Sequence, residues 1–105
     1  MDASTLFSRL DAATASFRSL ERQLADPDVA ADPKRLEVIA RERSRLEPLV
    51  VDFETLKQLE LEQAEARQLL KDSRGEPEME GLAQEELGAL ADRHLALTER
   101  LTLAL

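Results

Sequence analysis

The side chains that could do chemistry in this 105-residue chain are one histidine and several closely spaced acids. His94 is the only histidine, and a general base needs both a partner and a cleft. It lies between Leu90 and Leu97 at helical spacing. We therefore interpret it as a structural residue at the edge of a helix–helix seam rather than as a catalytic base.

The acids could suggest a metal site or a carboxylate dyad. Glu85 and Glu86 are adjacent, and further glutamates stand at positions 60, 62 and 65. Adjacent residues point to different sides of a helix and cannot converge on one ion. We interpret them as solvated helix faces. The chain also has no Gly-rich phosphate loop and no nucleophile elbow. We predict no catalytic residue, no metal site and no cofactor, and we predict that the chain is not an enzyme.

A basic cluster is the one group that suggests a partner. Its members are Lys34, Arg35, Arg41, Arg43 and Arg45. Acids at positions 37, 42 and 47 are interleaved, so most of these arginines can form helix-surface pairs worth ~0.3–0.5 kcal/mol. Two interpretations stay open. One is a salt-bridged surface, the commoner meaning of such a pattern, and the other is a partner contact through Arg41, Arg43 and Arg45.

Composition limits the classes of function. The net charge of −8 disfavours non-specific nucleic-acid binding, so any contact with RNA needs a local patch. The absence of cysteine excludes disulfides and thiolate metal sites. Apolar runs are too short to span a bilayer, and no signal segment follows Met1. We predict a cytoplasmic protein with no membrane partner.

Apolar spacing predicts three helices, over about 4–25, 33–71 and 78–104, in a single domain 1–105. The first stripe is Leu6, Leu10, Ala13, Phe17, Leu20 and Leu24, which share one helix face. The last stripe includes Met79, Leu82, Ala83, Leu87, Leu90, His94, Leu97 and Leu101. The fold class is therefore all-α, an elongated three-helix bundle of antiparallel helical hairpins.

Prolines mark the ends of these helices. Asp26-Pro27-Asp28 stops the first, residues 28–31 are expected to be a linker, and Asp32-Pro33 starts the second. Pro48 interrupts the second helix, but its apolar pattern resumes in phase. We therefore predict one long, kinked central helix.

Exposed apolar residues predict weak homo-oligomerisation. Leu59, Leu69 and Leu70 follow the part of the central helix that the first helix can reach. We expect nothing else in the chain to cover them.

Several segments resemble the amino-terminal domain of bacterial class I peptide chain release factors. They are Leu24-Ala-Asp-Pro-Asp-Val29, Asp32-Pro-Lys-Arg-Leu36, Arg41-Glu-Arg-Ser-Arg-Leu-Glu47, Pro77-Glu-Met79 and Leu82-Ala-Gln-Glu-Glu-Leu87. The first helix starts a few residues after Met1, and in this the chain resembles the member of the family that reads UAA and UAG.

The resemblance implies a helical domain that faces the ribosome. It would contact the stalk base of the large subunit and influence the GTPase release factor. The family's decoding tripeptide and Gly-Gly-Gln loop are absent here, so we expect a domain truncated before them, without peptide release activity. The alternative is a self-associating structural coiled-coil module unrelated to translation.

Overall fold

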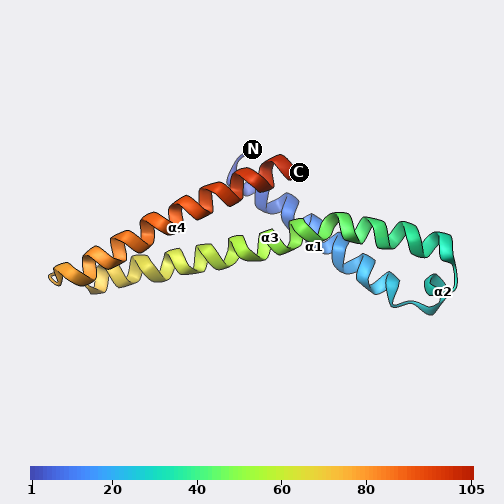
Figure 1. Cartoon of the computed structure of the whole chain (residues 1–105), viewed down its shortest axis with the longest axis horizontal. Helices are drawn as coiled ribbons and strands as arrows, with labels where there is room; N and C mark the ends of the chain where they lie inside the picture. Colours follow the sequence, from blue (N-terminus) through green and yellow to red (C-terminus); the bar gives the residue numbers. More distant parts are fainter. The chain divides into compact units, whose positions relative to one another are not determined.

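The computed structural model describes residues 1–105, and all of its regular structure is helical. The helices are α1 (Ala3–Leu24), α2 (Pro27–Ala30), α3 (Pro33–Asp72) and α4 (Pro77–Ala104) (Figure 1). The predicted all-α class is confirmed. The chain forms two compact units: unit 1 is Met1–Phe53 with Ala104–Leu105, and unit 2 is Glu54–Leu103. That residues 1–105 make a single domain stays a prediction.

Aspartates begin the two long helices of unit 1. The Asp2 carboxylate accepts a hydrogen bond from the Thr5 N–H at 2.7 Å, and Asp32 accepts one from the Arg35 N–H at 3.3 Å. Each bond satisfies an amide that the first helical turn leaves free. Pro33 then occupies the first position of α3, where no amide is needed. These local rules are why the predicted starts lie close to the observed ones.

The short helix α2 corrects the sequence interpretation. Residues 28–31 were expected to be a linker, but Pro27–Ala30 forms one helical turn. Asp26 caps it by accepting a hydrogen bond from the Asp28 N–H at 2.9 Å. Val29 is only 1% exposed, so burial of its side chain stabilises a turn that is too short to be stable alone.

In unit 1, α1 runs antiparallel to the first part of α3 (Figure 1). The rings of Phe7 and Phe53 meet edge to face, with centroids 5.3 Å apart and planes at 80°. This geometry is favourable for aromatic pairs. The buried apolar residues of the unit are Leu6, Leu10, Phe17, Val29, Ile39, Leu46, Leu49, Val50 and Phe53. The predicted stripe of the first helix thus supplies one side of this core.

Helix α3 continues through Pro48 without a break. The interpretation of one long helix rather than two is confirmed. A proline inside a helix removes one hydrogen bond and crowds the preceding turn. The kink expected there stays a prediction.

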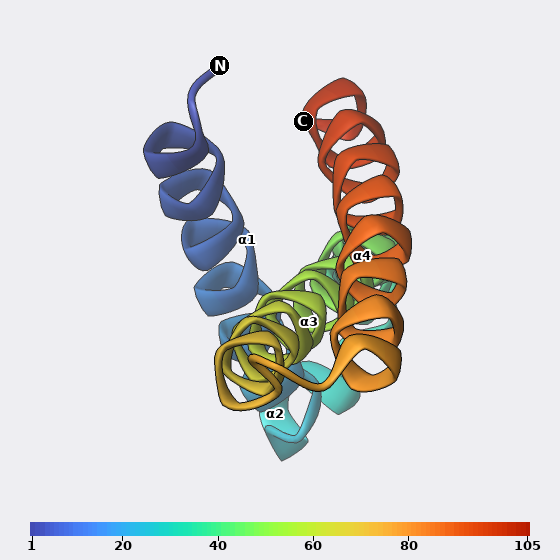
Figure 2. The same cartoon turned by 90° about the vertical axis from the view of Figure 1, so that its left-hand side faces the viewer.

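In unit 2, α4 returns beside the second part of α3 (Figures 1 and 2). Ala83, Leu90 and Leu97 are buried at intervals of seven residues, as in a coiled-coil seam. Met79 and Leu82 were predicted to lie in this seam, and that is wrong, because they are 40% and 59% exposed. Leu82 lies one residue, about 100° around the helix, from the seam position that Ala83 takes.

The burial of Leu59 also differs from expectation. It was predicted to lie uncovered, but it is 2% exposed within unit 2, where α4 supplies the covering helix. Leu69 is 42% exposed, as expected. Weak self-association stays a prediction, and less apolar surface now supports it.

Two glycines of unit 2 differ in what they do. Gly75, in the turn between α3 and α4, has φ +87°, a backbone conformation that side-chain-bearing residues avoid. Gly88 lies within α4 and has no positive φ, and an added Cβ there would have no atom within 4 Å.

Replacing Gly88 with alanine is therefore expected to raise the free energy of unfolding by ~1 kcal/mol, because glycine is the weaker helix former. Urea denaturation followed by circular dichroism measures the change. Gly75→Ala is the control and should lower stability, by about 1–2 kcal/mol. A loss of stability in Gly88→Ala would show that this position serves a close contact.

Candidate functional site

The predicted contact residues Arg41 and Arg45 are exposed on α3, and both are paired. Arg41 donates to Glu37 at 2.6 Å, and Arg45 donates twice to Glu42, at 3.0 and 2.7 Å. Their side chains remain 77% and 63% exposed. Four residues apart, they share a helix face and offer two cations, each held by a carboxylate.

Arg43 has a different environment. Arg43 is two residues from both Arg41 and Arg45, so it lies on a different face of α3, toward α1. Its side chain is 31% exposed. It donates to Glu47 at 2.8 Å and to Glu21 of α1 at 3.3 Å. Its guanidinium lies 4.8 Å from the ring centroid of Phe17, a cation–π contact. Arg43 therefore joins α1 to α3, and the structure does not place it on the Arg41–Arg45 face.

These pairs change acid–base behaviour. The hydrogen bonds from Arg45 lower the pKa of the Glu42 carboxyl and raise the pKa of the Arg45 guanidinium. The hydrogen bond from Arg18 lowers the pKa of the Glu21 carboxyl, and the hydrogen bond from Arg43 lowers it by less. The carboxylate forms are favoured in the folded chain.

A pH dependence follows from these lowered pKa values. A carboxyl whose folded pKa is depressed stabilises the fold above its unfolded value of 4.5, and this contribution is lost as pH falls through the folded pKa. The Glu21→Gln/Glu42→Gln variant should be less stable than the parent chain at neutral pH and approach it in acid. Urea midpoints measured from about pH 7 to about pH 2 test this. A constant difference across that range would contradict it.

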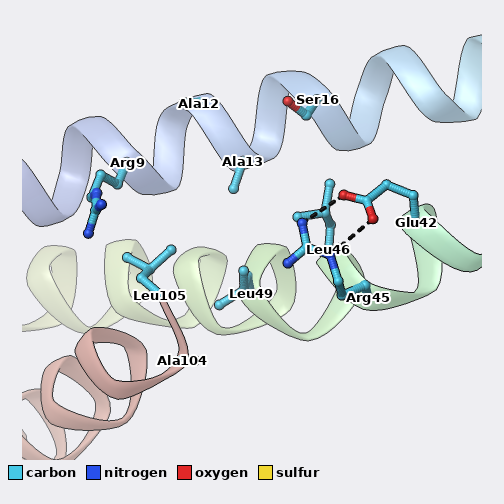
Figure 3. Close-up of a pocket in the computed structure, with 10 residues that line it drawn as sticks. All are labelled: Arg9, Ala12, Ala13, Ser16, Glu42, Arg45, Leu46, Leu49, Ala104 and Leu105. Atoms are coloured by element: carbon cyan, nitrogen blue, oxygen red, sulfur yellow. Dashed lines mark hydrogen bonds and ion pairs between the residues drawn. The ribbon is translucent and has the colours of Figure 1, made fainter.

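A groove of about 360 Å³ lies in unit 1 between α1 and α3 (Figure 3). Ala13 and Leu49 face each other across it, and Arg9 and the Arg45–Glu42 pair flank it. The other lining residues are Ala12, Ser16, Leu46, Ala104 and Leu105. Its one hydroxyl, on Ser16, has no histidine beside it, and the carboxylate of Glu42 is held by Arg45. The groove suits an apolar side chain rather than a nucleophilic reaction.

The single histidine meets a carboxylate from the other helix of unit 2. His94 Nε2 lies 3.6 Å from Glu60 Oε2, and that oxygen is buried without a hydrogen-bond donor. Glu60 was interpreted as part of a solvated face, which is wrong for this oxygen. No helical spacing could have indicated the pair, because its members come from two helices. No group of three or more potential metal ligands forms.

The sequence interpretation missed a second basic group. Arg67, Lys71 and Arg74 are exposed near the turn between α3 and α4. Arg67 and Lys71 are four residues apart on one side of α3, a signal that the sequence contains, and Arg74 lies in the turn after the helix. The cluster from Lys34 to Arg45 is denser and gives the stronger signal in the sequence.

Comparisons with known proteins add the family. The model of the PCRF domain matches residues 13–105. Peptide chain release factor 1 of Geobacillus kaustophilus is 36% identical over 100 residues, covering 95% of this chain and 28% of that protein. The Streptococcus mutans protein of the same name is 34% identical over 82 residues, covering 78% of this chain and 23% of that protein.

The chain thus spans about a quarter of the length of the curated relatives it matches. No solved structure matches it. None of its helices is long and apolar enough to cross a membrane. With nearly all of its length matched by one family model, the chain belongs to the PCRF domain family of peptide chain release factors.

Proposed function

We propose that this chain is the ribosome-facing helical domain of a translation termination factor of the UAA- and UAG-reading type. It contacts the stalk base of the large ribosomal subunit and influences the GTPase release factor, in the cytoplasm. The observation that carries the proposal is the family match over residues 13–105 together with 36% identity to a release factor 1.

Arg41 and Arg45 are the proposed contact residues. Their exposure leaves donors available to a partner, while their glutamate partners reduce the net attraction. Arg43, the third arginine of the predicted contact, contributes by holding α1 in place through Phe17 and Glu21. Such a small polar surface supports a dissociation constant in the micromolar range or weaker.

Charge reversal tests the contact. Arg41→Glu/Arg45→Glu is expected to weaken binding to large ribosomal subunits by roughly tenfold at low salt, and less at high salt. Cosedimentation of the purified chain measures this. Lys34→Glu/Arg35→Glu makes the same charge change earlier in α3 and serves as the control. Equal binding by both variants would remove the assignment to Arg41 and Arg45.

The chain by itself is proposed to have no peptide release activity. The groove between α1 and α3 has one hydroxyl, on Ser16, with no histidine beside it, and the chain contains no Gly-Gly-Gln sequence. Ribosomes stalled at UAA with labelled peptidyl-tRNA should release no more peptide with the chain than with buffer. Release at the rate of a complete factor would refute the proposal.

The second candidate is a self-associating coiled-coil module. The seven-residue spacing of Ala83, Leu90 and Leu97 favours it, because coiled coils use that repeat. This alternative requires that the sedimenting mass of the chain rise with its concentration. It also requires that the chain not bind ribosomal subunits.

A further inference from the structure

Three cations near the turn between α3 and α4 make no ion pair. Arg67, Lys71 and Arg74, together called the basic flank, are all exposed. No carboxylate lies within ion-pairing distance of any of them, whereas Arg41, Arg43 and Arg45 are each bound to a glutamate. A ligand anion that approaches the basic flank displaces only water and counterions, with no intramolecular pair to break.

The basic flank surrounds a hollow within unit 2. The hollow has a volume of about 390 Å³ and is lined by Arg67, Leu70, Lys71, Arg74, Glu80 and Gln84. Lys71 and Arg74 come from the end of α3 and the turn after it, and Glu80 and Gln84 come from α4. The cations thus stand beside a recess with an amide and one carboxylate rather than on a flat surface.

The acids of α3 closest in sequence to the basic flank project from another side of the helix, whereas Glu60 lies on the same side two turns before Arg67 and meets His94. At about 100° per residue, Glu62, Glu65 and Asp72 lie well over 90° around α3 from the middle of the basic flank. Asp72 is also engaged, since it accepts a hydrogen bond from the Gln68 side chain at 2.9 Å. The basic flank is therefore a local positive site on a chain whose net charge is −8.

We infer that the basic flank binds the phosphodiester backbone of RNA. Phosphates supply anions at regular intervals along a strand, and three cations that line one hollow, two on α3 and one in the turn after it, can meet several of them. Arginine forks bind phosphate oxygens through two donors, and the Gln84 amide can donate to a neighbouring sugar hydroxyl. Repulsion from the rest of the acidic chain keeps the interaction weak and confined to this site.

The inference rests on the proposed function for the source of the RNA, which is the ribosome. It also identifies the basic flank, rather than Arg41 and Arg45, as the surface that meets RNA. Those two arginines have glutamate partners at 2.6 and 2.7 Å, which reduce their net attraction for a phosphate.

The test is fluorescence anisotropy of the full chain with a fluorescein-labelled RNA hairpin, in KCl from about 50 to about 200 mM. Each phosphate contact adds about 0.7–0.9 to the slope of log Kd against log salt, so a slope of about 2–3 is expected. Arg67→Gln/Lys71→Gln/Arg74→Gln should lose most of that slope and weaken binding roughly tenfold or more at the lower salt. Arg22→Gln/Lys34→Gln/Arg35→Gln carries the same charge change and should bind as the parent chain does. Circular dichroism verifies that both variants remain helical.

Equal loss in the two triple variants would overturn the inference, because net charge and not position would then decide binding. Competition by polyglutamate as effective as that by unlabelled RNA would overturn it too, since the site would then be one for acidic protein.

Cosedimentation with large ribosomal subunits separates the two proposals. If the subunits bind the parent chain and the basic-flank variant equally, the inference fails and the proposed function stands. If the RNA hairpin binds through the basic flank but the subunits do not bind, the proposed function fails and the inference stands.

Discussion

Replacing Phe53 with alanine is expected to lower the free energy of unfolding by about 3–5 kcal/mol. The ring is 1% exposed and meets Phe7 edge to face, so truncation removes both buried area and an aromatic contact. Domains of this size are stable by only about 5–15 kcal/mol, so the loss is a large fraction of the total. Urea denaturation followed by far-ultraviolet circular dichroism measures it.

Two variants make this result specific. Phe53→Leu keeps most of the apolar volume and loses mainly the ring contact, so it should cost much less than the alanine variant. Val51→Ala, two residues away and 56% exposed, should change stability by no more than about 0.5 kcal/mol. Similar losses in Phe53→Ala and Val51→Ala would mean that Phe53 is not a core residue.

Leu90 has the corresponding role in unit 2. It is 1% exposed and occupies the middle of the seam between Ala83 and Leu97. Leu90→Ala is expected to lower the free energy of unfolding by about 2–5 kcal/mol, because removing buried methyl groups also leaves a cavity. The same denaturation measurement applies.

Leu95 provides a matched control on the same helix. It is 58% exposed, so Leu95→Ala changes the same atoms without opening a cavity, and a loss of about 0.5 kcal/mol or less is expected. If the two leucine variants lose equal stability, the seven-residue seam does not hold α4 against α3.

Family membership confirms one functional expectation. PCRF domains are not catalytic enzymes, which agrees with the prediction made from the scattered acids and the single histidine. The helix pattern could not have supplied the family by itself, because many helical domains share leucine spacing. The order of the Asp-Pro turns and the quoted segments made the resemblance recognisable.

Sequence by itself determined the long helices and most of their apolar faces. Asp2, Asp32 and Pro33 act within one turn of where they stand, and helical spacing is a property of neighbouring residues. Pro48 was correctly accommodated within one helix because the stripe on both sides kept its phase.

Tertiary structure decided which side chains are covered and which charges are neutralised. Leu59 is buried by α4, Arg43 is held by Phe17 and Glu21, and Glu60 meets His94, all through partners distant in sequence. The unpaired state of Arg67, Lys71 and Arg74 likewise depends on where α4 places its own side chains. Periodicity shows which face of a helix is apolar, but the partner of that face, and of each charge, depends on how the helices pack together.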